Sequence, residues 1–250
     1  MLTQERYQEI LQMVEAKGAV TVAELVEEIG TSESTIRRDL SSLHLMGKLK
    51  KVHGGATALT QEFISSEYDV NTKSAICVEE KNAIARYGAS TIQDEDFVYI
   101  DAGTSTQILV DYITCKRATY VTNGIVHAKK LIAKGMKTYL VGGMVKPITE
   151  AIIGAEGVNS IQKYNFTKAF MGTNGVHIDN GFTTVDAEEA LMKKAAMEHS
   201  YMSYVLADHT KFGKVTAVTF APIEKACIIT DALVNDKYKQ ATLIKEVLKE

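Results

Sequence analysis

Six short apolar runs, each ending in small or polar residues, constrain the fold of this chain more than any other feature. They lie within residues 97–103, 118–124, 137–143, 167–175, 203–210 and 225–231, and most are separated by segments of helix length. This spacing is typical of strand–helix units that build a largely parallel sheet. Ligands of such sheets bind beyond the carboxyl ends of the strands. We therefore expect one rim to gather Asp101, Asn123, Gly142, Asn174 and Asp208.

The first 56 residues follow a different pattern, which is that of a small helical unit. Apolar side chains recur at helical spacing within residues 7–14, and Thr21 with Glu24 forms a capping-box pattern before a second helix. Ser32 is the expected N-cap of a third helix after a tight turn. A basic strand, "KLKKV", and a glycine turn, "HGGA", follow as a β-wing. We interpret residues 1–56 as a winged helix-turn-helix domain, residues 57–74 as a linker and residues 75–250 as an α/β domain.

The outward face of the third helix carries groups that suit DNA. Ser34, Arg37 and Arg38 share this face, whereas Ile36 and Leu40 point the opposite way. Arginine can reach guanine edges or phosphates, and serine can bridge to either. The chain has a formal net charge of −3, but residues 31–56 hold five Lys or Arg against two acidic residues. The alternative is that the two arginines simply solvate an exposed helix.

Other features of the sequence argue against several classes of protein. Cys77, Cys115 and Cys227 are widely spaced and odd in number, so they predict neither a disulfide framework nor a metal-ligand cluster. The N-terminus lacks a signal-peptide pattern, and no apolar run approaches the roughly 18 residues of a membrane span. We therefore expect a cytoplasmic protein that does not bind a membrane, and we predict no cofactor and no metal.

The sequence "DAGTST", at the end of the first apolar run, has the composition of a phosphate-binding turn. Gly103 lets backbone N–H groups approach a phosphate, and the hydroxyls of Thr104, Ser105 and Thr106 add donors. Asp101 can accept a hydrogen bond from a sugar hydroxyl. A generic turn between a strand and a helix is the alternative.

Charged residues elsewhere supply further candidates for an effector site. Lys81, near the start of a predicted helix, can provide the cation for a phosphate, although a solvated lysine is the commoner role. Asp208 and Lys211 bring a carboxylate and an ammonium to one strand end, where a salt-bridged turn is the alternative. The remaining candidates for contact with an effector are Asn123, Gly142, Gly143, Asn174, Thr183, Asp186 and Glu188.

The segment "GFTTVDAEEALMKKA" contains the start of another helix. Asp186 is its expected N-cap, and Glu189 is the expected capping-box partner. Lys193 and Lys194, further along the same helix, are expected to be surface charges.

The segment "TSESTIRRDLSSLHLMGKLKKVHGGA" resembles the DeoR family of bacterial transcription regulators. That family carries a Ser-x-x-Thr-Ile-Arg-Arg-Asp-Leu recognition helix and a His-Gly-Gly-Ala wing exit, and this chain fills both patterns. The resemblance implies that operator DNA is a partner. The residues that it implies for DNA contact are Ser34, Thr35, Arg37 and Arg38 in the groove and Lys50, Lys51 and His53 at the backbone. For His53, which precedes two glycines, a residue that packs within the turn is the alternative.

The resemblance continues through "EEKNAIARYGASTI", "MGTNGVHIDNGFTTVDAEEA" and "ADHTKF". These segments look like the effector domain of the family, which is related to ribose-5-phosphate isomerase and binds phosphorylated sugars. Within the family, the sequence from about residue 135 to 212 is most similar to repressors of fructose operons, whose inducer is fructose 1-phosphate. The resemblance thus implies a repressor that a sugar phosphate releases from DNA and that forms a homodimer or homotetramer. A repressor that responds to a different sugar phosphate is the nearer alternative.

A sugar-phosphate isomerase with an added N-terminal domain is a second class. Its chemistry requires a general base and a group that stabilises the developing oxyanion. The isomerase relatives have an Asp-Gly-Ala-Asp-Glu motif after the strand at which this chain has Gly172, Thr173, Asn174 and Gly175. We therefore expect no catalytic residue and no enzyme activity. A structural or protein-interaction module is a third class, and it leaves Arg37 and Arg38 of the third helix without a role.

Overall fold

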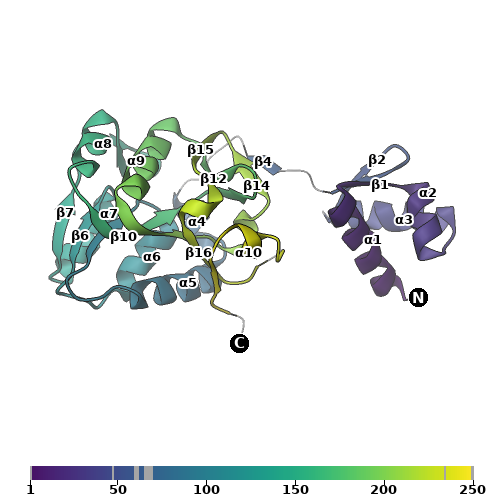
Figure 1. Ribbon diagram of the computed structural model, residues 1–250, viewed down its shortest axis with the longest axis horizontal. Coiled ribbons are helices and arrows are strands. Elements are labelled where there is room, and N and C mark those ends of the chain that lie inside the picture. Colours follow the sequence, from purple (N-terminus) through teal and green to yellow (C-terminus); the bar gives the residue numbers. More distant parts are fainter. Residues whose placement is uncertain (1, 47, 59–61, 65–69, 234, 249–250) are drawn as a thin grey trace. The chain divides into compact units, whose positions relative to one another are not determined.

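The computed structural model describes residues 2–46, 48–58, 62–64, 70–233 and 235–248 (Figure 1). Contacts within the chain divide it into two compact units, Met1–Glu62 and Phe63–Glu250. The predicted linker, 57–74, contains strand β4 (Glu62–Ile64) and most of helix α4 (Val70–Ala75). Its residues 59–61 and 65–69 lie outside the described residues.

The N-terminal unit has three helices and a small antiparallel sheet. Its elements are α1 (Thr3–Lys17), β1 (Ala19–Thr21), α2 (Val22–Ile29), α3 (Glu33–Leu45), β2 (Lys50–Val52) and β3 (Gly55–Thr57). The strand order is β1-β3-β2, so the hairpin β2–β3 forms the predicted wing on β1. Ile10, Leu25, Ile36, Leu40 and Leu43 pack into a single core. The expected winged helix-turn-helix fold is confirmed.

Local sequence signals define the start of α3. Thr21 accepts a hydrogen bond from Glu24 N while its own N–H donates to the Glu24 carboxylate, which completes the predicted capping box of α2. Gly30 ends α2 with φ 69°, a left-handed conformation that favours glycine. Ser32 Oγ then accepts the N–H of Thr35 at 3.3 Å and caps α3.

The second unit is built on a seven-stranded sheet in which all neighbouring strands are parallel, in the order β17-β16-β13-β10-β5-β6-β7. The strands are β5 (Phe97–Ile100), β6 (Thr119–Thr122), β7 (Lys137–Leu140), β10 (Phe166–Gly172), β13 (Ser200–Leu206), β16 (Cys227–Thr230) and β17 (Ile244–Glu246). The first six correspond to the six apolar runs. The edge strand β17 was not predicted, because its sequence Ile-Lys-Glu carries little apolar signal.

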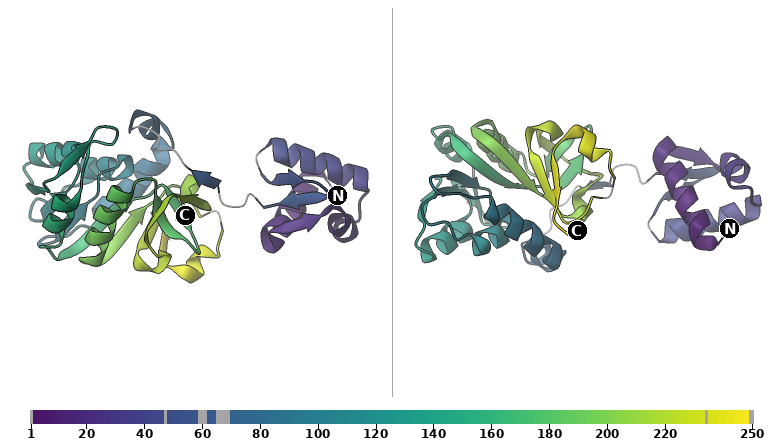
Figure 2. Two further views of the ribbon diagram at one scale, coloured as in Figure 1. Left: turned by 90° about the horizontal axis from the view of Figure 1, so that it is seen from above. Right: turned by 60° about the horizontal axis from the view of Figure 1, so that its bottom comes forward.

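Helices cover both faces of this sheet (Figures 1 and 2). One face packs against α5 (Val78–Ser90), α6 (Thr104–Tyr112) and α7 (Ile125–Ala133). The other packs against α8 (Ala155–Ile161), α9 (Ala187–Glu198) and the antiparallel strands β11 (Gly175–His177), β12 (Gly181–Thr184) and β15 (Val218–Ala221). Along β10, Ala169 and Met171 face the second layer and Phe170 the first, as expected for alternating strand side chains.

Short elements complete the second unit. A hairpin of β8 (Met144–Lys146) and β9 (Ala151–Ile153) precedes α8, and β14 (Lys214–Thr216) pairs with β4. The turns His209–Lys211 and Ile223–Lys225 are 3-10 helices, and α10 spans Tyr238–Ala241. The sequence did not predict the β8–β9 hairpin, whose turn proves important for the site.

Candidate functional site

Helix α3 presents a polar face to solvent, as its periodicity predicts. Ser34, Arg37 and Arg38 are exposed and Thr35 is partly exposed. The opposite face is buried in the core of the unit. Four side chains of suitable chemistry therefore lie on the accessible side of the expected recognition helix.

Arg37 is held by a neighbour on its own helix. Its guanidinium donates to Glu33 Oε1 at 2.5 and 2.8 Å, an i,i+4 pair in which both side chains are more than half exposed. Exposed ion pairs contribute little, typically below about 1 kcal/mol. A DNA phosphate or base edge can therefore displace Glu33 at small cost.

The wing brings further positive charge beside α3. Lys50, Lys51 and His53 are exposed on the β2–β3 hairpin and its turn. Lys51 Nζ donates to Ser41 Oγ on the outward side of α3 at 2.7 Å. This contact fixes the wing against the recognition helix, so that both elements offer cations on one surface.

Asp39, an acidic residue of the recognition helix, is turned away from that surface. Its carboxylate accepts two hydrogen bonds from Arg6 of α1, at 2.5 and 3.2 Å, and its side chain is 4% exposed. The pair fastens α3 to α1. Because Asp39 is neutralised in the interior, the exposed surface is more positive than the residue count of this segment suggests.

The second unit contains a cavity of about 300 Å³ beyond the carboxyl ends of β5, β10 and β13. Its walls come from the loops after these strands, the start of α7, the β8–β9 turn, and helices α4, α5 and α9. Six of the predicted effector-site residues line it: Lys81, Gly103, Thr104, Ser105, Asn174 and Lys211. Other predicted residues lie outside its lining.

Asn123 and Thr106 support the phosphate-type turn from behind. Asn123 is buried, where its Oδ1 accepts from Ala102 N at 2.8 Å and its Nδ2 donates to Ile152 O at 3.1 Å. Thr106 Oγ1 donates to Gly103 O at 2.9 Å and lies 3.1 Å from Nε2 of His127. Both side chains are occupied within the protein, so they position the turn instead of lining the cavity.

Five more predicted residues do not line the cavity, either because they are used within the fold or because they lie elsewhere on the unit. Thr183 is buried and accepts from Thr216 N at 3.0 Å. Asp186 caps α9 by accepting from Glu188 N and Glu189 N, both at 2.9 Å, which agrees with its predicted role as N-cap. Glu188 is exposed, and like Gly142 and Gly143 it does not line the cavity.

Lys193 corrects a sequence-based expectation. It was expected to be a surface charge, but it is 5% exposed, lines the cavity and forms an ion pair with Asp101. Asp101 also accepts from Gly172 N at 3.0 Å. Burial raises the pKa of Asp101, and the ammonium of Lys193 offsets part of that rise. The pair joins the end of β5 to α9 under the cavity floor.

Glu189 does not act as the predicted capping-box partner of Asp186. Its Oε1 instead accepts from Lys146 Nζ at 3.0 Å and from Thr149 Oγ1 at 2.9 Å, both in the β8–β9 hairpin. The residue is 8% exposed and lines the cavity. Glu189 and Lys193 are one helical turn apart, so α9 directs a carboxylate and an ammonium to the same wall.

Four lysines line the cavity near the end of β13: Lys73, Lys81, Lys211 and Lys214. Lys81 Nζ donates to the backbone carbonyls of Lys73 and Ile76, so it ties α4 to α5. Burial lowers the pKa of Lys81 and of Lys211, while the buried carboxylate of Asp208 raises both. Among the described residues, no hydrogen-bond acceptor or carboxylate contacts Lys211 Nζ. This ammonium is therefore available to an anionic ligand.

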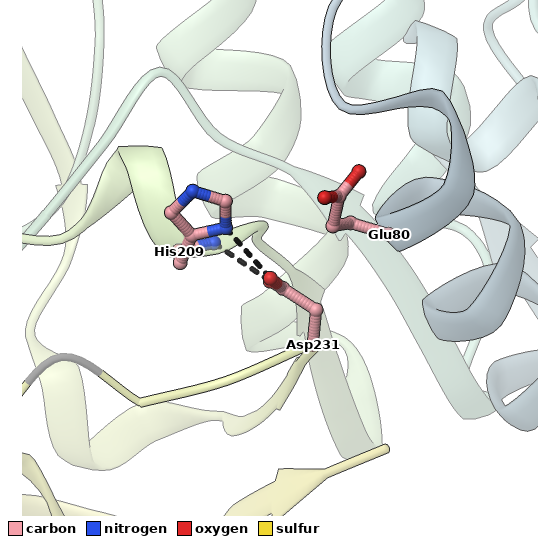
Figure 3. A group of neighbouring side chains, drawn as sticks. All are labelled: Glu80, His209 and Asp231. Atoms are coloured by element: carbon pink, nitrogen blue, oxygen red, sulfur yellow. Dashed lines mark hydrogen bonds and ion pairs between the residues drawn. The ribbon is translucent and has the colours of Figure 1, made fainter. Parts of the chain in front are cut away.

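The turn that carries Lys211 is anchored by a neighbouring group of side chains (Figure 3). His209 donates its N–H to Asp231 at 2.7 Å, and its ring Nδ1 lies 2.6 Å from the same carboxylate. Glu80 of α5 lies beside them, and the three side chains have ligand atoms within 4.8 Å of one another. The sequence did not predict this group. Its two hydrogen bonds support a role in fixing the His209–Lys211 turn.

Sequence reasoning missed several cavity residues, and the reasons differ. Val70 and Lys73 fall in the segment interpreted as a linker. Thr149 and Glu150 form the turn of an unpredicted hairpin. His127 lies at the start of α7, where burial lowers its pKa to about 4. The polar face of α9 was the one available signal, since Glu189 and Lys193 recur at helical spacing.

An exposed basic recognition helix in one unit and a lysine-lined cavity in the other define a DNA-binding protein with a ligand-sensing domain. Comparison with known families agrees: residues 6–62 match the DeoR-like helix-turn-helix domain, and residues 76–232 match the DeoR C terminal sensor domain. The chain belongs to the DeoR family of transcription regulators.

Relatives of known name support the same class. The chain is 44% identical to the "Uncharacterized HTH-type transcriptional regulator FruR" of Bacillus subtilis (strain 168), over 99% of both chains. It is 32% identical to the "Lactose phosphotransferase system repressor" of Staphylococcus aureus (strain N315), over 98% of both chains. These similarities confirm the expectation of a regulator that is not an enzyme.

Similarity to solved structures is more distant. The match with ribose 5-phosphate isomerase A from Methanocaldococcus jannaschii covers 53% of each chain, with a TM-score of 0.38 and 10% identity.

None of the helices among the described residues combines the length and the apolar composition that a membrane span requires.

Proposed function

We propose that this protein represses a sugar-utilisation operon and that a phosphorylated sugar, with fructose 1-phosphate as the best candidate, releases it from the operator. The observation that carries this proposal is Lys211, a partly buried ammonium that lines a cavity and has no partner among the described residues. A buried cation is costly unless it is paired, which favours an anionic ligand at this position.

The turn before α6 suits the phosphate of such a ligand. Gly103, Thr104 and Ser105 line the cavity at the N-terminus of α6, where backbone N–H groups and the helix dipole favour an anion. Asn174, from the loop after β10, lines the same cavity. Its Oδ1 accepts from Thr184 Oγ1 at 3.0 Å, and its Nδ2 can donate to a sugar hydroxyl. The names of the relatives, which include a lactose phosphotransferase system repressor, are consistent with a sugar-derived ligand.

Release from DNA follows from linkage between the two ligands. A sugar phosphate weakens operator binding only if it binds the DNA-free arrangement of the protein more tightly than the DNA-bound arrangement. We further propose that the protein acts as a homodimer or homotetramer, because paired recognition helices one DNA turn apart suit a palindromic operator. Ser34, Thr35, Arg37 and Arg38 are the proposed groove contacts.

The test is a thermal-shift titration of the full chain with fructose 1-phosphate, tagatose 6-phosphate and glycerol 3-phosphate, followed by a gel-shift assay with the operator. Specific binding raises the melting temperature with the logarithm of ligand excess. We expect fructose 1-phosphate to give the largest shift and to reduce the retarded DNA band. A shift only with another sugar phosphate would replace the inducer, and no shift with any of them would refute the sensing role.

A further inference from the structure

The cavity has a positive end and a negative end, and the order of the strands defines their positions. Strands β13, β10, β5 and β6 are consecutive neighbours in the sheet, so β13 and β6 are separated by three strand spacings of about 4.8 Å each. Lys211 and Lys214 follow β13. Glu150 lies at the opposite end, where its carbonyl accepts from Ile125 N at the start of α7, which follows β6.

Glu189 belongs to the negative end. Its carboxylate accepts from Thr149 of the same hairpin turn, and Glu189, Thr149 and Glu150 all line the cavity. The nearest cation, Lys146, is shared between Glu189 and Asp186, with 3.0 Å to each carboxylate. Lys146 therefore does not cancel the negative charge at this end.

Lys193, the lysine of α9 that lines the cavity, is also paired with a carboxylate. Its partner is the buried carboxylate of Asp101, so Lys193 does not neutralise Glu189, which lies one helical turn away. At the other end, Asp208 is the carboxylate whose field acts on both Lys81 and Lys211. The lysine end thus attracts an anion, and the glutamate end repels one.

We propose that Glu189, assisted by Glu150, makes the cavity selective for sugars that carry a single phosphate and excludes bisphosphorylated sugars. This inference rests on the proposed function as a sugar-phosphate sensor. One phosphate binds at the α6 N-terminus and Lys211, and the sugar hydroxyls extend toward the carboxylates, which accept hydrogen bonds from them. A second phosphate at the far end of the sugar meets the buried carboxylate of Glu189, where like-charge repulsion is only weakly screened. The exposed carboxylate of Glu150 adds a smaller repulsion, because solvent screens it.

The experiment compares fructose 1-phosphate with fructose 1,6-bisphosphate by isothermal titration calorimetry of the full chain. We expect the bisphosphate to bind about tenfold more weakly or worse. In Glu189→Gln the amide oxygen can still accept from Lys146 and Thr149, so the hairpin contact persists while the charge is lost. We expect this variant to reduce the preference for the monophosphate by a factor of about three or more.

Two further variants complete the test. Glu198→Gln is the matched control: it makes the same change on the same helix, at a residue that pairs with Lys194 and does not line this cavity. Glu150→Gln removes the other charge from an exposed turn, and it is informative even if Glu189→Gln fails to fold.

The outcomes separate this inference from the proposed function. If neither sugar binds the unmodified protein, fructose 1-phosphate is refuted as the inducer and this inference is refuted with it. If the monophosphate binds but the bisphosphate binds equally well, the inference is refuted and the sensing function stands. The same holds if neither glutamine variant changes the ratio more than Glu198→Gln does.

Discussion

The buried pair of Asp101 and Lys193 gives the sharpest prediction for the stability of the second unit. The side chain of Asp101 is 2% exposed and that of Lys193 is 6% exposed. Lys193→Met keeps most of the apolar stem but removes the ammonium. Asp101 then keeps one hydrogen bond, from Gly172 N at 3.0 Å, and no longer has its cation.

Removal of one partner of a buried ion pair typically costs about 3–5 kcal/mol, because the other charge stays buried without compensation. The remaining hydrogen bond from Gly172 places the expected loss for Lys193→Met near the lower limit, at about 3 kcal/mol. For a domain of this size, each kcal/mol lowers the melting temperature by about 2–4 °C. We therefore expect a decrease of about 6–12 °C.

The loss depends on pH in a defined direction. Burial already raises the pKa of Asp101 above its ordinary value of 3.8, and removal of Lys193 raises it further. The folded variant then binds a proton at pH values where the unfolded chain does not, so its stability falls as pH rises through that window. The deficit relative to the unmodified protein is full above the folded pKa and shrinks as pH falls toward 4.

The assay is thermal denaturation, followed by circular dichroism, at pH 8 and pH 5. Lys194→Met is the matched control, since Lys194 is the next residue and its side chain is 57% exposed. The double variant Asp101→Asn, Lys193→Met removes both charges and should recover a substantial part of the loss. The reasoning is refuted if Lys193→Met is no less stable than Lys194→Met, or if the double variant is no more stable than Lys193→Met.

Three further predictions address the DNA-binding surface, the cavity and acid stability. Arg37→Ala should weaken operator binding by about 1–3 kcal/mol, whereas Glu33→Gln, which frees Arg37, should not weaken it. Gel-shift titration measures both variants, and equal losses of affinity would contradict a DNA contact by Arg37. Lys211→Met should leave operator binding unchanged, and it should leave the melting temperature of the free protein unchanged or raise it. In calorimetry it should weaken sugar-phosphate binding by at least about 1.4 kcal/mol, or tenfold. Loss of DNA binding would show that the two roles are not separate. His127 has its pKa lowered from 6.5 to about 4 by burial, so the folded state resists its protonation and loses stability as pH falls from 6.5 to 4. Urea denaturation should show that His127→Gln removes up to about 3 kcal/mol of that pH dependence, and an unchanged slope would contradict the assignment.

The sequence by itself determined the architecture and the local signals of each element. Thr21 with Glu24 and Ser32 act as helix caps where their spacing predicted, because a cap involves only residues within one turn. The six apolar runs became strands of one parallel sheet, since alternating or continuous apolar patterns reflect burial on a sheet. The wing and the polar face of α3 followed from the same local rules.

Parts of the candidate site were also visible in the sequence. The turn at Gly103 lines the cavity as expected, because a glycine-rich turn after a strand sits at the carboxyl edge of the sheet. The sequence indicates Lys81 and Lys211 as candidates, but the burial that lowers their pKa comes from segments distant in the sequence. Asn123 and Asp208 lie at the predicted edge of the sheet, yet both are buried and do not line the cavity.

The tertiary structure alone decided which polar side chains face the ligand and which hold the scaffold. Lys193 and Asp101 are 92 residues apart, and their pairing depends on how α9 packs over the end of β5. Glu189 meets Lys146 and Thr149 only because an unpredicted hairpin folds back onto the same helix. Helical periodicity identifies side chains that share a face, but the partner of that face is set by packing between distant segments. The charge pattern that divides the cavity into a positive and a negative end is therefore a property of the fold.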